Sequence, residues 1–301
     1  TVDRLGKGLR TGPRDALIAA STPAESLGHS FGVHRAMDTI GAAVGPLLAF
    51  TILLLVPGNY TGVFVASSAA AILGLVVLGL LVPNLRPRRD SGETSAAPSR
   101  PSMRAMTRSG MGRLVVAAAL LSVLAISDGF LYLSLQQRDN LAATWFPLLF
   151  VGTNVAYFLL AIPFGRLADR LGRQRVLVGG HVLLVGAYLC AAGPAYGAIT
   201  TVLCLVLLGA FYAATDGVLA ALTSTLVPTS LRAVGIATTQ TVVATARFVC
   251  AILFGVLWTF VGRGPAVLVF AVLLAAAIPV AWWLLSSLRP VPLLTANEAS
   301  T

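Results

Sequence analysis

The sequence predicts an all-α membrane protein, folded as a bundle of many helices. Of the 301 residues, 57% are hydrophobic and only 11% are charged, whereas about a quarter of a soluble domain is charged. The hydrophobic residues form long runs, and an apolar run of roughly 20 residues spans a bilayer as a helix. The runs are too long for the strands of a membrane β-barrel and lack their alternating pattern.

Nine spans follow from these runs when they are taken in order. They cover about residues 5–22, 31–56, 60–82, 113–135, 143–164, 175–193, 196–226, 233–261 and 265–288. The first span is unusual because it carries several charges. The other eight are typical of helices that cross a bilayer.

The only long polar segment, residues 83–112, is rich in Pro, Ser, Arg and Ala, a composition typical of a flexible linker. It predicts a partial N-terminal half over residues 1–82 and a six-helix C-terminal half over 113–288. Residues 289–301 follow as a tail. The arginines of the linker either stay solvated or contact anionic lipid.

Arginines in the loops predict the orientation. Nearly all of them fall on one side of the predicted membrane, and only Arg138 and Arg263 fall in loops on the other. Because cytoplasmic loops carry the excess of Lys and Arg, we expect the linker and the C-terminus to be cytoplasmic. The predicted location is the cell inner membrane, crossed many times.

The pattern of reactive residues gives no indication of an enzyme. Cys190, Cys204 and Cys250 each lie inside an apolar run, where a small buried hydrophobe is the ordinary role. The sequence shows no metal-ligand spacing, Ser-His-Asp set or phosphate-binding glycine loop, so we expect no metal and no cofactor. The net charge of +10 comes mainly from short loops, so it does not indicate nucleic-acid binding.

A charged segment, Gly165–Arg175, separates two apolar runs and reads GRLADRLGRQR. Five charges in eleven residues predict a tight loop at the membrane surface, with turns at Gly165 and Gly172. The pattern resembles the signature loop of the major facilitator superfamily, which recurs between helices 8 and 9. The resemblance implies that Asp169, with Arg170 and Arg173, holds a cytoplasmic gate shut.

With this loop between helices 8 and 9, the nine spans become helices 4 to 12 of the resembled family. The chain opens on Thr1 rather than Met, and we therefore expect a fragment or an incomplete gene model that lacks helices 1 to 3. The predicted fold is a major-facilitator-type bundle with an incomplete N-terminal half. We expect a monomer when the chain is complete.

A second resemblance lies in the fifth helix, where small residues and a proline follow the spacing G-x8-G-x3-G-P. It consists of Gly32, Gly41, Gly45 and Pro46. The pattern is similar to the antiporter motif of drug efflux members, although Phe50 stands where the family has a glycine. Close packing of helices through small residues is the alternative.

The opening span carries charges at membrane depth. Arg4 and the glycine four positions later resemble the helix 4 motif of the family, and Arg14 and Asp15 follow. Such charges are costly unless they face a cavity or a partner. We expect this face to line a water-filled path; a surface segment is the alternative.

Asp38, near the start of helix 5, is a further candidate. It lies three residues after Arg35, a spacing at which the two side chains can pair on a helix.

Polar side chains also occur in the predicted helices 7, 10 and 11. Asp128 and Tyr132 are four apart in helix 7, Asp216 lies in helix 10, and Gln240 and Arg247 share a face of helix 11. The resemblance implies that helices 7 and 10 line the central cavity. Burial favours the protonated form of a carboxyl, so these aspartates can carry protons. Arg247 should have Asp128 or Asp216 as its partner, and His181 is a weaker candidate.

These features together predict a secondary active transporter that works by alternating access. We expect proton-coupled export of a small organic solute or drug, with protons, the solute and the lipid bilayer as its partners. Uptake by proton symport stays open. The other alternative is a membrane receptor or assembly protein that derives from a carrier and does not transport.

Overall fold

The computed structural model describes residues 41, 43–81, 110–193, 197–226 and 232–288. Within these ranges every regular element is a helix, as the sequence predicts. The chain divides into two compact units, Thr1–Thr94 and Ser95–Thr301. Their boundary falls in the segment expected to be a linker, and the two-half organisation stays a prediction.

The first unit contains a short apolar helix, Ala43–Leu55, and the longer helix α3, Tyr60–Leu81. Gly58 has a φ of 80° in the turn between them, a conformation that glycine adopts without strain. The side chain of Asn59 accepts a hydrogen bond of 2.9 Å from the backbone N–H of Gly62 and so caps α3. None of the 22 residues of α3 is buried, so its apolar surface suits lipid or other helices.

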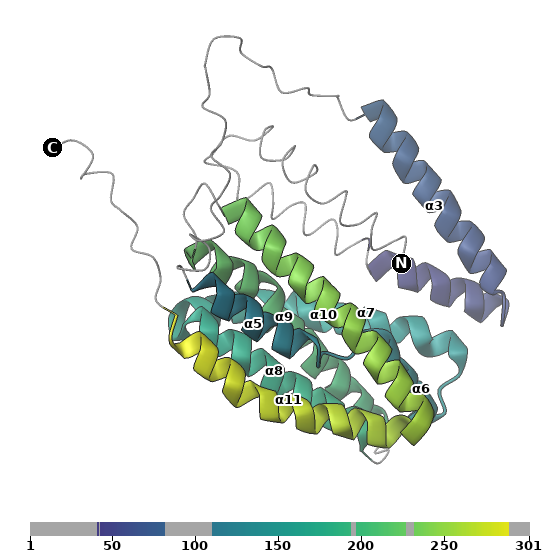
Figure 1. Ribbon diagram of the computed structural model, residues 1–301. Coiled ribbons are helices and arrows are strands. Elements are labelled where there is room, and N and C mark those ends of the chain that lie inside the picture. The colour runs from purple at the N-terminus through teal and green to yellow at the C-terminus, as the bar shows by residue number, and fades with distance from the viewer. Residues whose placement is uncertain (1–40, 42, 82–109, 194–196, 227–231, 289–301) are drawn as a thin grey trace, which may run out of the picture. The chain divides into compact units, whose positions relative to one another are not determined.

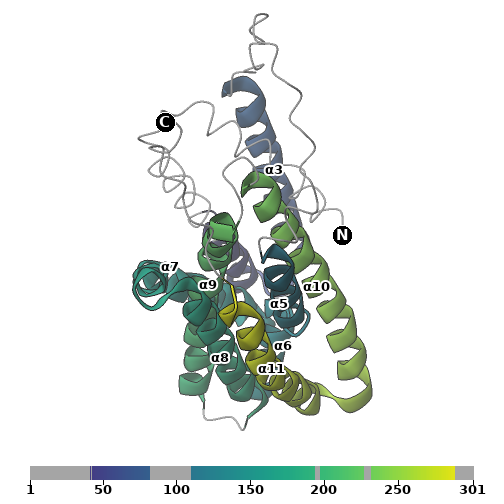
Figure 2. The ribbon, with the colours of Figure 1, turned by 60° about the vertical axis from the view of Figure 1, so that its left-hand side comes forward.

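The second unit is a bundle of five long helices and two shorter ones in its described part (Figure 1). These are α5 (Met111–Ser122), α6 (Asp128–Asp139), α7 (Phe146–Leu171), α8 (Arg173–Ala192), α9 (Ala198–Leu226), α10 (Arg232–Val261) and α11 (Arg263–Ser286). Helix α9 packs against α7 and α8, while α11 packs against α5 and α8; Figure 2 shows α11 beside these two helices from another side. Helix α6 ends at Asp139 at one end of the bundle, the Asp139 end, and α7 ends next to Gly172 at the other.

One predicted span, residues 113–135, is not a single helix. Helix α5 ends at Ser122 and α6 begins at Asp128, and Val123–Ser127 form an irregular break between them. Each of the two helices has 12 residues, or about 18 Å at 1.5 Å per residue, so neither crosses a hydrocarbon core of about 30 Å alone. The backbone groups at the break need other partners, and a side chain from α8 supplies them.

The predicted loop over Gly165–Arg175 is also different in the structure. Helix α7 continues through Leu171 and α8 begins at Arg173, so Gly172 is the only residue between them. Gly172 has a φ of 97°, whereas Gly165 lies within α7. The helix persists because Ala168, which is 4% exposed, packs into the core; a charged sequence at a helix end does not require a loop.

Six of the described helices are long and apolar enough to cross a membrane. Five of them belong to the second unit, where their contacts build a core that includes Tyr188, Phe254 and Leu274. Small residues bring the helices close: an added Cβ at Gly209 of α9 would lie 2.6 Å from the backbone nitrogen of Tyr157 on α7. Such packing is typical of membrane bundles.

Candidate functional site

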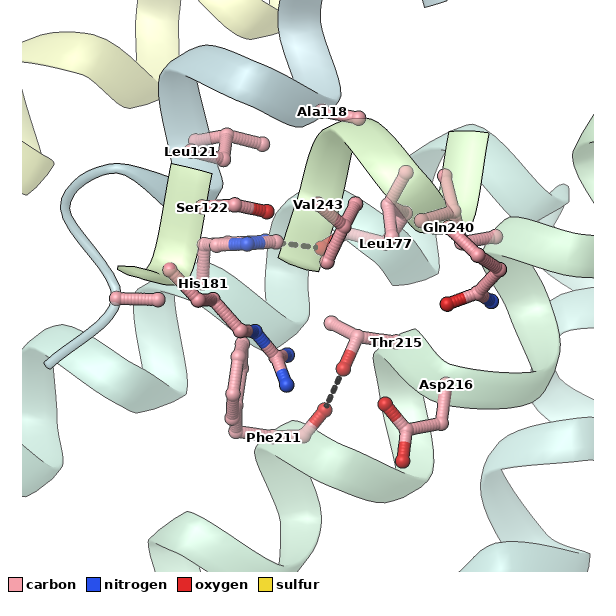
Figure 3. Close-up of a pocket in the computed structure, with 13 residues that line it drawn as sticks. Ala118, Leu121, Ser122, Leu177, His181, Phe211, Thr215, Asp216, Gln240 and Val243 are labelled. Atoms are coloured by element: carbon pink, nitrogen blue, oxygen red, sulfur yellow. Dashed lines mark hydrogen bonds between the residues drawn. The ribbon is translucent and has the colours of Figure 1, made fainter. Parts of the chain in front are cut away.

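A cavity of about 60 Å³, lined by both polar and apolar side chains, lies between α5, α8, α9 and α10. Because one water needs roughly 10–15 Å³ of such volume, it has room for a few water molecules. It is lined by Ala118, Leu121, Ser122, Ala125, Leu177, His181, Phe211, Thr215, Asp216, Leu219, Gln240, Val243 and Arg247. Figure 3 shows the side chains of Ser122, His181, Thr215, Asp216 and Gln240 around this space.

Three of the residues predicted from sequence meet at this cavity. Asp216 comes from α9, while Gln240 and Arg247 come from α10. The spacing of seven residues puts Gln240 and Arg247 on one face of their helix. The cavity therefore contains a carboxylate, an amide and a guanidinium on two helices that are joined by residues 227–231.

Arg247 is only partly satisfied by the residues around it. Its Nε is buried and has no hydrogen-bond partner within the described part of the chain. Its Cζ lies 5.9 Å from the ring centroid of Tyr212, which is within the range of a cation–π interaction. A buried N–H without an acceptor is costly, so this guanidinium favours an additional acceptor.

Tyr212 connects Arg247 to another predicted residue. Its hydroxyl donates a hydrogen bond to the carboxylate of Asp128, the first residue of α6. The prediction that Arg247 pairs with Asp128 or Asp216 stays open, but both carboxylates lie in its surroundings. Asp216 lines the same cavity as Arg247, and Asp128 is linked to Arg247 through Tyr212.

His181 is more central than the sequence indicated. It is 6% exposed and lines the cavity from α8. Its Nδ1 lies 2.9 Å from the backbone oxygen of Leu177, and its ring makes an edge contact with Phe211 at 5.2 Å. Donation from Nδ1 leaves Nε2 as an acceptor. The feature of the sequence that could have identified His181 is its position as an ionisable residue within an apolar span.

Tyr132, expected beside Asp128 on a polar path, lies elsewhere. It is 1% exposed, and its hydroxyl donates a hydrogen bond of 2.8 Å to Thr153 of α7. Its ring makes edge contacts with Phe146 and Phe150. The structure therefore places Tyr132 in the contact between α6 and α7 rather than on the cavity.

The gate residues are described in part. Gly172 separates α7 from α8, Arg170 is exposed, and Arg173 Nη1 lies 3.4 Å from the carbonyl oxygen of Ala221 on α9. Asp169 belongs to α7, while its side chain lies outside the described structure.

The helix 5 pattern is described only from Gly41 onward. At Gly41 and Gly45 an added Cβ meets no atom within 4 Å, and Pro46 lies in the helix Ala43–Leu55. The remaining predicted residues lie outside the described ranges: Arg4, Arg14, Asp15, Gly32 and Asp38.

The sequence missed a polar network at the Asp139 end of the bundle. Arg138 pairs with Asp139 at 2.7 Å, and their side chains are 3% and 9% exposed. Arg138 also donates to Thr201 of α9 and to the carbonyl of Cys190, near the end of α8. Arg263 donates to the carbonyl of Ala191 at 3.0 Å. Two arginines that seemed to be topology signals therefore bind the end of α8, where the helix dipole favours cations.

Comparison with known proteins agrees with this architecture. The family model described as Major Facilitator Superfamily matches residues 140–300. An uncharacterized MFS-type transporter of Methanocaldococcus jannaschii is 28% identical over 265 residues, which cover 86% of this chain and 64% of that protein. An uncharacterized protein of Mycobacterium tuberculosis is 27% identical over 180 residues, which cover 58% of this chain and 44% of the relative. The chain thus spans less than two thirds of these relatives.

A solved structure shows the same fold. The crystal structure of a mutant of the nucleoside transporter NupG superposes with a TM-score of 0.65 at 15% sequence identity. The match covers 85% of this chain and 67% of that one. With the family match over more than half of its residues, this chain belongs to the Major Facilitator Superfamily and is a multi-pass membrane protein.

Proposed function

We propose that the protein to which this chain belongs is a proton-coupled secondary transporter that exports a small organic solute by alternating access. The cavity supports this proposal most strongly, because it joins Asp216, Gln240 and Arg247 in membrane-spanning helices. Ionisable side chains at membrane depth are expensive and are characteristic of substrate and proton pathways. In this scheme Asp216 and Asp128 carry protons, and Arg247 offers donors to a carboxylate at the cavity.

The helix 5 pattern is the basis for the proposed direction of transport. Its resemblance to the antiporter motif, with Gly41, Gly45 and Pro46 in the described part, favours exchange of the solute for protons. In an exchanger, exit of protons drives entry of the solute into the same compartment. In a symporter, both move together, so the sign of the imposed pH gradient distinguishes the two.

The experiment uses the protein in its full natural length, reconstituted in liposomes, with ethidium as the probe. Vesicles with an acidic lumen should accumulate external ethidium, and a protonophore should abolish the accumulation. Asp216→Asn and Asp128→Asn should each reduce the initial rate about a hundredfold or more, the range typical of lost proton-transfer groups. Thr241→Val, an exposed position on α10, is the control and should leave the rate unchanged.

Three other results would change the proposal. Accumulation only with an alkaline lumen would indicate symport. Full activity in both aspartate variants would remove the proposed proton carriers. Absence of any gradient-driven movement of ethidium by a folded protein would favour the receptor or assembly role over drug export.

A further inference from the structure

Tyr212 of α9 contacts charged groups on two other helices. Its hydroxyl donates to the carboxylate of Asp128 on α6, and its ring lies 5.9 Å from Cζ of Arg247 on α10. We infer that Tyr212 is the positioning residue through which the protonation of Asp128 changes the setting of Arg247 at the cavity. This inference rests on the proposed proton-coupled transport and adds the residue that links proton to solute.

Asp128 needs such a link. It is not among the described residues that line the cavity, whereas Asp216 and Arg247 are. An intermediate group can therefore transmit the effect of a proton on Asp128 to the cavity. Tyr212 is suited to this role because one side chain holds the carboxylate by its hydroxyl and the guanidinium by its ring.

The strength of the hydrogen bond from the Tyr212 hydroxyl to Asp128 depends on whether Asp128 is protonated. A hydrogen bond to an ionised carboxylate is roughly twice as strong as one between neutral groups. When Asp128 gains a proton, the hold on the Tyr212 hydroxyl therefore weakens and the ring is freer to move. Asp128 also directly follows the break Val123–Ser127, where the backbone lacks the continuous ladder of a helix.

The contact between the Tyr212 ring and Arg247 leaves the guanidinium able to move when the ring moves. Its Nε has no acceptor within the described structure, and a guanidinium has five N–H donors to place. A cation–π contact is less directional than a hydrogen bond. A shift of the Tyr212 ring can therefore redirect the guanidinium toward an acceptor in the cavity.

Three tyrosines in the described structure lie near Asp128. Tyr132 lies on α6 itself, Tyr188 on α8 and Tyr212 on α9. Tyrosine titrates in water near pH 10, so Asp128 is the group in this set that accepts protons in the acidic to neutral range.

Two further ionisable groups lie close to Arg247. His181 approaches it from α8, and Asp216 lines the same cavity. Substitution of the Tyr212 hydroxyl leaves both of these side chains in place. Because Asp216 also lies near Tyr212, the pH profile of Tyr212→Phe is compared with that of Asp128→Asn, and equal flattening in these two variants reports on the link to Asp128.

The test is the pH profile of ethidium accumulation in proteoliposomes of the full-length protein. Tyr212→Phe keeps the ring and removes the hydroxyl, so it should flatten the profile between about pH 5.5 and 8 while KM changes less than about twofold. Tyr212→Leu removes the ring as well and should also raise KM. Tyr132→Phe is the matched control, because its hydroxyl binds Thr153 and its loss should leave the profile intact.

The possible failures are distinguishable. If the unsubstituted protein shows no pH-dependent accumulation, the proposed proton coupling is wrong. The inferred role of Tyr212, which depends on proton coupling, is then wrong as well. If the unsubstituted protein is pH-dependent and Tyr212→Phe keeps the same profile, the transporter proposal stands and the role of Tyr212 is wrong. Equal flattening in Tyr132→Phe would also overturn the inference, since the effect would not be specific to the contact with Asp128.

Discussion

The hydroxyl of Tyr188 accepts a hydrogen bond of 2.6 Å from the backbone N–H of Ile126 and donates one of 2.9 Å to the carbonyl of Leu124. These backbone groups belong to the break between α5 and α6. In hydrocarbon, a backbone group without a partner costs several kcal/mol, so broken helices persist only where other groups replace the lost bonds. One buried side chain of α8 thus satisfies a donor and an acceptor of the interrupted helix.

Tyr188→Phe should destabilise the second unit although it keeps the shape of the ring. The variant leaves one buried N–H and one buried C=O with fewer partners, at a cost of about 1–3 kcal/mol for each unsatisfied group. The measurement is thermal unfolding in detergent, followed by the reaction of a thiol dye with Cys204 and Cys250, which are both 0% exposed. The apparent melting temperature should fall.

A matched control is Tyr60→Phe at the start of α3. Tyr60 is 52% exposed, so loss of its hydroxyl should leave the melting temperature unchanged. Equal stability of Tyr188→Phe and the unsubstituted protein would mean that the break finds its partners elsewhere.

The break also shows what local sequence patterns omit. Residues 123–127 read VLAIS, without the proline or glycine that usually marks a helix end, and they continue the apolar run. Their partner Tyr188 is 62 residues away from Ile126. Hydropathy therefore located the span correctly, whereas its interruption depends on a tertiary contact.

The candidate site was predictable where the residues are ionisable and lie in apolar spans. Asp216, Gln240 and Arg247 could be identified because polar groups at membrane depth are rare, and the structure brings them to one cavity. Tyr132 was placed on a polar path because four-residue spacing gives a common face, yet it turns toward Thr153. Spacing identifies residues on one face of a helix, but not the neighbour to which each side chain turns.

Arg138→Gln should strongly destabilise the Asp139 end of the bundle. The substitution removes the directly paired cation from Asp139, whose side chain is 9% exposed, and leaves it the hydroxyl of Thr201 and the more distant Arg263. Loss of a hydrogen-bonded partner by a part-buried charged group typically costs about 1.5–3 kcal/mol. The same thiol-dye assay should show a lower melting temperature, and the double variant Arg138→Gln with Asp139→Asn should recover part of it.

The control for this pair is Arg113→Gln at the opposite end. Arg113 donates one exposed hydrogen bond to Ser287, and exposed charged contacts contribute about 0–1 kcal/mol. A small effect is therefore expected. If Arg138→Gln were no worse than Arg113→Gln, the network around Asp139 would have no structural role.

Two glycines of α9 should respond in opposite ways to alanine. A Cβ at Gly209 would lie 2.5 Å from Cβ of Ala156 and 2.6 Å from the nitrogen of Tyr157, whereas one at Gly217 meets no atom within 4 Å. Gly209→Ala forces α7 and α9 apart and should cost about 1–3 kcal/mol. Gly217→Ala should be neutral or stabilise by up to about 1 kcal/mol. Equal melting temperatures for the two variants would contradict the close approach of these helices.

The turn between α7 and α8 gives a similar comparison at the predicted gate. Gly172 has a φ of 97° and a ψ of 134°, a region that side chains with a Cβ rarely adopt. Gly172→Ala should therefore cost about 1–3 kcal/mol in backbone strain. Gly165 lies inside α7 with no atom within 4 Å of an added Cβ, so Gly165→Ala should preserve or slightly raise the melting temperature. A loss of stability in Gly165→Ala equal to that in Gly172→Ala would instead favour a second turn at Gly165 and a real loop in this segment.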